Sequence, residues 1–255
     1  MNRNPVWLRL KDELAQVATV ALKDIRIYYL QPPMIMFGIL LPFFLFFSFS
    51  IKRNIGAEAG IAQLLAMTTF FTASSAGPVI IPLERRMGTY DRLLAAPMSL
   101  ATLLIGKTLV GAFFALIASI LPLLVGVLWL DVAITDVALL IAGLLLASLT
   151  FAAFGMVFGS VPAQSVGSIM MPSTLIRWPL LFISGIFIPL SDMAPWVRTL
   201  AYLSPLTYAH DVLHFAISGD GHLNYWLDLA LMVVLVIVFL VPASLLHRRS
   251  RVLGR

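Results

Sequence analysis

The sequence has no cysteine among its 255 residues and very few charged side chains. Without cysteine, disulfides and cysteine-ligated metal sites are excluded. Only 11% of the residues are Asp, Glu, Lys or Arg, whereas soluble domains carry about 25%. Because 60% of the residues are hydrophobic, a soluble core of this size could not hide them, and lipid must be the solvent for much of the chain.

Six apolar runs are each about as long as a helix that spans a bilayer, which needs about 20 residues. Backbone polar groups must be paired within hydrocarbon, so these runs are predicted to be helices. We therefore expect an all-α integral membrane protein whose six-span domain covers residues 33–246. The predicted spans are 33–51, 61–83, 103–130, 137–160, 168–190 and 224–246.

The basic residues predict the orientation of the spans. Thirteen of the 17 Lys and Arg residues precede the first span, lie between spans two and three or at the start of span three, or follow the last span. Cytoplasmic segments are enriched in these residues, so we expect a multi-pass protein of the plasma (inner) membrane with both termini in the cytoplasm. The net charge of +5 then reflects cytoplasmic loops and a basic tail at 247–255, and no nucleic-acid partner is expected.

Residues 1–32 form a separate cytoplasmic or interfacial region. Apolar residues recur every three or four positions, and a polar stripe lies opposite them, which is typical of an amphipathic helix in the membrane interface. A helix packed on a soluble partner is the alternative. The apolar positions are Leu14, Ala18, Ala21, Ile25 and Tyr28.

Two motifs resemble chemical sites without fitting them. The stretch "ATLLIGKT" at 101–108 ends like a phosphate-binding loop, but Ala101 replaces the required first glycine and the run favours a helix. Lys107 is instead predicted to snorkel to the interface. The stretch "HDVLH" places His210 and His214 four residues apart, but Asp211 stands in place of the Glu of a zinc protease. His222 is a candidate third ligand whose position Gly219 and Gly221 leave unpredictable. We assign no catalytic residue and no metal ligand here, and a membrane metalloenzyme using His210 and His214 remains an alternative.

Arg177 lies within the fifth span, where a cation is costly and should face protein or a wet cavity. One interpretation is that it lines or gates a transport pathway. The other is that it pairs with a helix C-terminus or a buried acid.

The segment "LERRMGTYDRLLAAPMS" at 83–99 interrupts the apolar runs with charges and turn residues. Gly88 predicts a turn, Thr89 is a candidate N-cap, Pro97 should end a short helix and Ser99 should cap the next one. No span carries a midplane acid or histidine, so we expect energy either to enter from outside the bilayer or to be absent. A short amphipathic helix hinged at both ends suits docking into a partner's groove, and an ordinary solvated loop is the alternative.

This segment resembles the loop between spans two and three in type-2 ABC exporter permeases, the ABC-2 family. Arg86 stands where that family often has an acid, and Asp91 where Glu is usual. The matching residues are Glu84, Arg85, Gly88, Thr89, Asp91, Leu93, Leu94, Pro97, Gly106 and Lys107.

A second stretch, "SGIFIPLSDMAPWVRTLAYLSPLTY" at 184–208, resembles the family's helices that re-enter the membrane from outside. Three prolines divide it into pieces too short to span, which agrees with that resemblance. The residues expected at this outer gate include Ser184, Gly185, Pro189, Pro195, Trp196, Pro205 and Tyr208.

The resemblance implies a non-catalytic permease that moves a drug, lipid or glycan-type substrate outward. It implies a second copy of the permease, most simply as a homodimer, and two separate cytoplasmic ATPases that bind ATP and Mg. Glu84, Arg85, Asp91 and Arg92 would orient the docked coupling helix, and Leu93 and Leu94 would supply buried contact. This chain itself is expected to bind no cofactor. A secondary transporter or channel working without an ATPase is the alternative.

Overall fold

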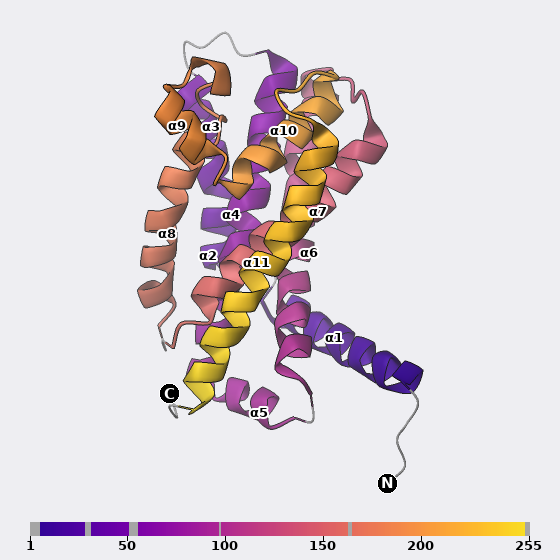
Figure 1. Ribbon diagram of the computed structural model, residues 1–255, viewed down its shortest axis with the longest axis vertical. Coiled ribbons are helices and arrows are strands. Elements are labelled where there is room, and N and C mark those ends of the chain that lie inside the picture. Colours follow the sequence, from indigo (N-terminus) through magenta and orange to yellow (C-terminus); the bar gives the residue numbers. More distant parts are fainter. Residues whose placement is uncertain (1–5, 29–31, 51–55, 97, 163–164, 253–255) are drawn as a thin grey trace.

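The computed structural model describes residues 6–28, 32–50, 56–96, 98–162 and 165–252, and this part of the chain is all helical, with no strand (Figure 1). The elements in chain order are α1 (Val6–Tyr28), α2 (Pro32–Ile35), the π-helix η1 (Met36–Leu40), α3 (Leu41–Ser50), α4 (Ala57–Arg86), α5 (Thr89–Ala95), α6 (Leu100–Trp129), α7 (Val137–Gly159), α8 (Val166–Ile183), the 3₁₀ turn η2 (Leu190–Asp192), α9 (Pro195–Ala201), α10 (Pro205–Ser218) and α11 (Tyr225–Val252).

Five helices among the described residues are long and apolar enough to cross a membrane, namely α4, α6, α7, α8 and α11. The predicted first span folds as α2, η1 and α3 in succession over residues 32–50, and its apolar part, Gly38–Ser48, is shorter than a full span. Residue 51 of that prediction lies outside the described residues. A spanning helix over residues 33–51, which would bring the number of spans to six, therefore stays a prediction.

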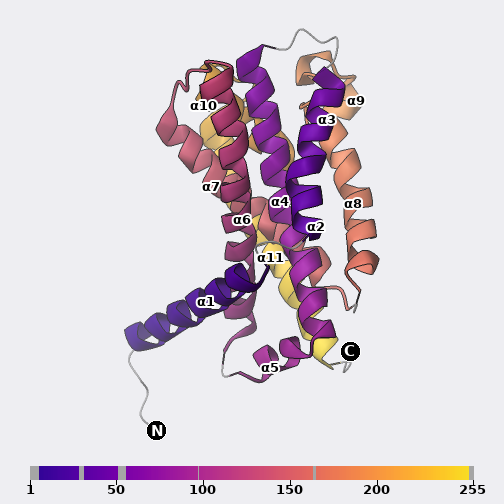
Figure 2. The same ribbon diagram turned by 180° about the vertical axis from the view of Figure 1, so that it is seen from behind.

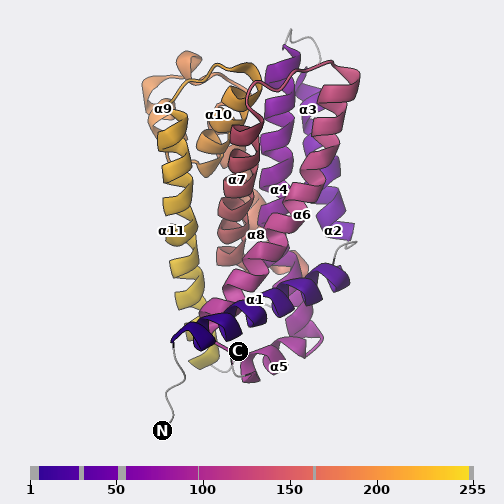
Figure 3. The same cartoon turned by 90° about the vertical axis from the view of Figure 1, so that its right-hand side faces the viewer.

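The helices form an elongated bundle with two different ends (Figures 1 and 2). At one end lie α5, the last turns of α11 and α1, which runs across the bundle axis (Figure 3). We call this the basic end, because Arg85, Arg86 and Arg92 are there. The opposite end carries α9 and α10, and we call it the acidic end, after Glu58, Asp131 and Asp220.

The central helix of the bundle is α4, whose most apolar window is entirely buried. It packs against α6, α7 and α10. The contact with α7 depends on glycine, because a Cβ at Gly155 would lie 2.5 Å from the Ser74 carbonyl oxygen and one at Gly77 would lie 2.5 Å from the Gly155 carbonyl oxygen. Small residues let two transmembrane backbones approach this closely.

Prolines inside the helices leave carbonyl groups without their usual backbone donors. Pro78 has no N–H for the Ser74 carbonyl four residues earlier, and Arg177 Nη2 of α8 donates to that oxygen at 2.7 Å. Pro42 likewise has no N–H to donate to the Gly38 carbonyl, and Thr72 Oγ1 donates to that oxygen at 2.9 Å. Side chains thus replace backbone donors where water is excluded.

The segment after α8 differs from the fifth span predicted at 168–190. The helix ends at Ile183, and Gly185 follows with a φ of 90° that other residues rarely adopt. The Ser184 hydroxyl donates to the Leu181 carbonyl at 2.7 Å and helps to end the helix. The span prediction was thus about seven residues too long, because the apolar run continues past the turn.

The glycine contact between α4 and α7 gives the first prediction. Gly155→Ala should destabilise the protein by about 1–3 kcal/mol, since the new methyl group would overlap the α4 backbone. The measurement is the unfolding temperature of the purified protein in detergent. The matched control is Gly167→Ala on α8, where the nearest atom is the Ser165 hydroxyl oxygen at 3.7 Å and the unfolding temperature should hold or rise. Equal unfolding temperatures for the two variants would contradict the close crossing.

Candidate coupling site at the basic end

The helix α5 is formed by local signals on both sides. Gly88 has a φ of 68°, which glycine adopts without strain, and it occupies the N-cap position. Thr89, predicted to be the N-cap, is the first helical residue instead, and its hydroxyl donates to the Glu84 carbonyl at 3.3 Å. The helix ends at Ala95, and Ala96 is extended, as expected for a residue before proline. Pro97 itself lies outside the described residues.

The next helix begins as the sequence predicted. The Ser99 side chain accepts a hydrogen bond from the Thr102 backbone N–H at 3.0 Å, so it caps α6. Unpaired N–H groups in the first turn of a helix favour such a cap. The connection between α5 and α6 is therefore short and well defined at its α6 end.

One side of α5 packs onto the chain and the other side faces outward. Tyr90 is buried, and Leu93 and Leu94 are half-buried against an apolar cluster that includes Leu103 and Leu104 of α6. The two leucines that were expected to contact a partner thus contact their own chain here. Exposed side chains nearby are those of Arg86, Met87 and Arg92, whereas the side chain of Asp91 lies outside the described residues.

Two further contacts join α5 to distant helices. The Tyr90 ring lies edge-to-face with His247 of α11, with a centroid distance of 5.7 Å. The guanidinium of Arg85 stands 5.1 Å from the centre of the Tyr90 ring, and its Nη1 donates to the Val161 carbonyl after α7 at 2.7 Å. A displacement of α5 would therefore disturb the contacts that α11 and the turn between α7 and α8 make with it.

A buried ion-pair cluster lies directly behind α5, formed by Lys23, Asp24, Glu84 and Lys107. Lys107 Nζ is 2.9 Å from Asp24 Oδ2 and 2.5 Å from Glu84 Oε2. Lys23 Nζ is 2.7 Å from Asp24 Oδ1 and also pairs with Glu84. Two cations and two anions balance, so the cluster is formally neutral while it joins α1, α4 and α6.

Because the cluster is buried, each of its charged groups needs a partner of opposite charge. The side chains of Asp24, Glu84 and Lys107 are 0% exposed and that of Lys23 is 31% exposed. Burial by itself lowers the pKa of Lys23, but hydrogen bonds to the Asp24 and Glu84 carboxylates outweigh this effect and raise that pKa above its ordinary value. Lys23 therefore stays charged at neutral pH and contributes to the cluster.

Two sequence-based expectations are corrected by this cluster. Lys107 does not snorkel to the interface, because its ammonium group is fully buried between two carboxylates. Glu84 was expected to orient the docked coupling helix, but its carboxylate is used inside the chain. It acts on α5 through its backbone, whose carbonyl accepts from Thr89.

The residues expected at the outer gate lie together at the acidic end. Pro195 and Pro205 occupy the first turns of α9 and α10. Trp196 is 70% exposed, whereas Tyr208 is buried and its hydroxyl donates to the Tyr202 carbonyl. Pro189 is exposed and precedes η2. Short helices are present as predicted, and their re-entry into the membrane stays a prediction.

The two histidines of "HDVLH" lie on one face of α10, with ring centroids 6.0 Å apart. Asp211 between them holds a loop, since its carboxylate accepts from the backbone N–H groups of His222 and Leu223 at 2.8 and 3.1 Å. His214 Nδ1 lies 2.9 Å from the Asp220 carbonyl oxygen. Within the described part of the chain, no group of three or more His, Asp or Glu residues is placed to hold a metal ion.

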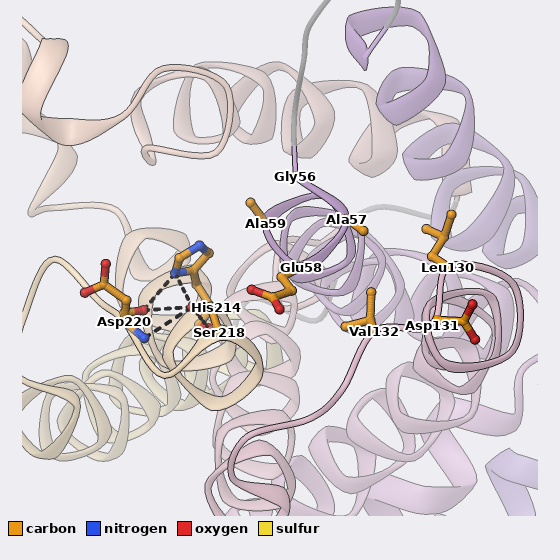
Figure 4. A pocket seen from close by; sticks show the side chains of 10 residues that line it. All are labelled: Gly56, Ala57, Glu58, Ala59, Leu130, Asp131, Val132, His214, Ser218 and Asp220. Atoms are coloured by element: carbon orange, nitrogen blue, oxygen red, sulfur yellow. Dashed lines mark hydrogen bonds between the residues drawn. The ribbon is translucent and has the colours of Figure 1, made fainter.

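A cavity of about 500 Å³ opens at the acidic end, where Glu58, Asp131 and His214 are among the lining residues (Figure 4). Several of its polar groups bond one another, since the Ser218 hydroxyl donates to the Asp220 carbonyl oxygen at 3.1 Å. It lies at the other end of the bundle from α5, so it takes no part in the coupling site.

Arg177, the remaining candidate, is placed in the middle of the bundle. It is fully buried and contacts Ser74 and Ser75 of α4. Its partners are neither an acid nor a helix C-terminus, so that expectation was wrong. Pro78 marks the Ser74 carbonyl as lacking its backbone donor, but nothing in the sequence identifies Arg177 as the residue that replaces it.

Comparison with known proteins places the chain in context. The model of the family described as ABC-2 type transporter matches residues 15–217. The chain is 26% identical over 205 residues to Nodulation protein J of Neorhizobium galegae, covering 77% of each protein. It is 30% identical over 100 residues to Nodulation protein J of Rhizobium leguminosarum bv. viciae, covering 39% of this chain and 38% of the relative.

The ion-pair cluster gives the second prediction. Lys107→Met should destabilise the protein by about 3–5 kcal/mol, because it leaves two buried carboxylates with one partly exposed cation. The measurement is the unfolding temperature in detergent, followed by size-exclusion chromatography. Lys23→Met is the matched control and should cost clearly less, since that ammonium is partly solvated. A Lys107→Met variant as stable as the unmodified protein would show that the pairing contributes nothing.

Proposed function

Because this chain belongs to the ABC-2 type transporter family, we propose that it is the permease subunit of an ATP-driven exporter and that α5 is its coupling helix. The permease would move an amphipathic substrate outward through the plasma (inner) membrane, with both termini in the cytoplasm. Two cytoplasmic ABC ATPases, which bind ATP and Mg, would supply the energy. A second copy of the chain would complete the pathway.

The observation that supports this proposal most strongly is the set of connections made by α5. Its ends touch α4 and α6, and Tyr90 touches both α11 and Arg85 of α4, whose guanidinium reaches the α7–α8 turn. Behind it, the ion-pair cluster ties α1 to α4 and α6. A force applied to α5 would thus reach the principal helices that meet at the basic end, as a rigid-body transition between two states of a transporter requires.

The exposed surface at α5 indicates how an ATPase would dock. Leu93 and Leu94 already pack inside the chain, so the contacts are assigned to Arg86, Met87 and Arg92, which are exposed. Two arginines flanking an apolar side chain suit a groove with an acidic rim. Charge complementarity of this kind favours encounter and fixes the orientation of the partner.

The third prediction tests this docking surface. The chain is co-expressed with the ABC ATPases of its own genome, one at a time, and the ATPase retained on the purified permease is quantified. Charge reversal by Arg86→Glu with Arg92→Glu should lower the retained ATPase about tenfold or more, because the complementary rim becomes repulsive. The unfolding temperature should hold, since both side chains are exposed.

The matched control reverses two exposed charges at the acidic end, Asp192→Lys with Asp220→Lys. This variant should retain as much ATPase as the unmodified permease. The proposal fails if no ABC ATPase binds the chain, or if the α5 double variant binds as well as the control.

A further inference from the structure

Arg177 is a wholly buried cation in the middle of a membrane-spanning helix. Its relative exposure is 0%, and it lies roughly 16 Å along α8 from Val166, at 1.5 Å per residue. The other end of α8, at Ile183, is roughly 9 Å away along the axis. The side chain does not extend to either end, because its guanidinium donates to Ser74 and Ser75 of α4. A cation held there is expensive and is a mark of function in membrane proteins.

The hydrogen-bond partners of the Arg177 guanidinium are neutral. Nη1 donates to the Ser75 hydroxyl oxygen at 2.9 Å, and Nη2 donates to the Ser74 carbonyl oxygen at 2.7 Å and the Ser173 hydroxyl oxygen at 3.1 Å. Nε is buried without a hydrogen-bond partner. Among the side chains that the structure describes, no carboxylate forms a salt bridge with Arg177.

A structural role explains the hydrogen bonds of Arg177 but not its charge. Pro78 leaves the Ser74 carbonyl without its backbone donor, and Arg177 supplies one. A neutral donor such as glutamine could fill that role without the cost of a buried charge. The positive charge itself needs another explanation.

The face of α4 that carries Ser75 is polar over about two turns. Thr68, Thr72 and Ser75 recur at helical spacing on one face, and we call them the α4 track. The Thr68 hydroxyl is 0% exposed and has no hydrogen-bond partner, whereas Thr72 contacts Gly38 in η1. The track thus keeps unused hydrogen-bonding capacity within a membrane-spanning core.

The helices around the α4 track are suited to move. Within α8, Pro172 and Pro179 stand on either side of Arg177, and proline weakens a helix by removing backbone hydrogen bonds. The helix lies at one side of the bundle (Figures 1 and 2) and packs on α4, α7 and α9. Met171 and Leu175 on its outer side are 78% and 74% exposed, which suits lipid.

We propose that Arg177 and the α4 track bind the anionic headgroup of an amphipathic molecule when α8 separates from α4. The headgroup would be a phosphate, sulfate or carboxylate, which a guanidinium binds through two parallel hydrogen bonds. The apolar tail would lie along the exposed apolar side of α8, near Met171 and Leu175. This assignment rests on the transport function proposed above and names the class of substrate.

The first experiment uses the absence of native cysteine. Ser75→Cys places a single thiol at the position that Arg177 Nη1 contacts, and the variant is treated in membranes with anionic or cationic methanethiosulfonate reagents. The anionic reagent should react about tenfold faster or more, because Arg177 attracts it. In an Arg177→Gln background the ratio should fall to about one, and Arg177→Lys should restore the preference.

Ser119→Cys is the matched control. Ser119 is also a buried hydroxyl residue, but it lies on α6 and contacts Thr69, outside the α4 track. Its thiol should resist both reagents. If Cys at position 75 resists them equally, α8 does not separate from α4, Arg177 is a structural tie only, and the proposal is overturned.

The second experiment identifies the ligand chemistry and needs only the Ser75→Cys variant, so it stands even if Arg177→Gln fails to fold. The purified protein is placed in phosphatidylcholine nanodiscs with 1-oleoyl lysophosphatidic acid, with monooleoylglycerol, or with inorganic phosphate. Lysophosphatidic acid should slow modification of the thiol about tenfold, while the other two probes leave it unchanged. Equal protection by the two lipids would overturn the anionic headgroup, and equal protection by inorganic phosphate would overturn the amphipathic ligand.

These experiments use the permease without an ATPase. Their failure therefore bears on the headgroup site alone. Failure of ATPase binding at α5 would instead overturn the proposed function and leave the thiol measurements as they stand.

Discussion

The buried pairing of Lys107 with Asp24 and Glu84 is the interaction on which the basic end depends. Its three side chains come from α6, α1 and α4, and each is fully buried. A buried charge that loses its partner is costly, so the three helices are held in the one geometry that keeps these charges paired. Since Glu84 lies in the last turn of α4, just before Gly88, the same pairing fixes the place where α5 begins.

The helix α4 connects this cluster to Arg177. Glu84 and Ser74 are roughly 15 Å apart along the helix axis, at 1.5 Å per residue. On the Ser74 side of Pro78, α4 and α7 approach each other too closely at Gly155 for one helix to slide along the other. Pro78 and Pro82 lie between the two sites, and each removes a backbone hydrogen bond. A force on α5 would therefore bend α4 at these prolines rather than shift the whole helix, and the bend would begin beside the carbonyl that Arg177 holds.

The sequence predicted those features that depend on neighbouring residues. Apolar length located five spanning helices, and local turn chemistry located Gly88 and the Ser99 cap. It did not predict the burial of Lys107, because its partner Asp24 is 83 positions away and a pairing over such a distance leaves no periodic signal. For Arg177, the cost of an intramembrane cation marked the residue, but the contact with Ser74 required knowing that α8 lies beside α4.

The chain handles buried charge in two opposite ways, and the contrast explains why Arg177 suits a ligand. At the basic end each buried cation faces carboxylates, so the cluster is neutral without any other molecule. At Arg177 the chain supplies hydroxyl and carbonyl oxygens, which orient a guanidinium but do not cancel its charge. A permanent tie is most stable when it is neutral. A site for an anion must be positive while it is empty, since a resident carboxylate would compete with the ligand. The unpaired charge is therefore a cost that binding an anion would remove, whereas a purely structural role would have no use for it.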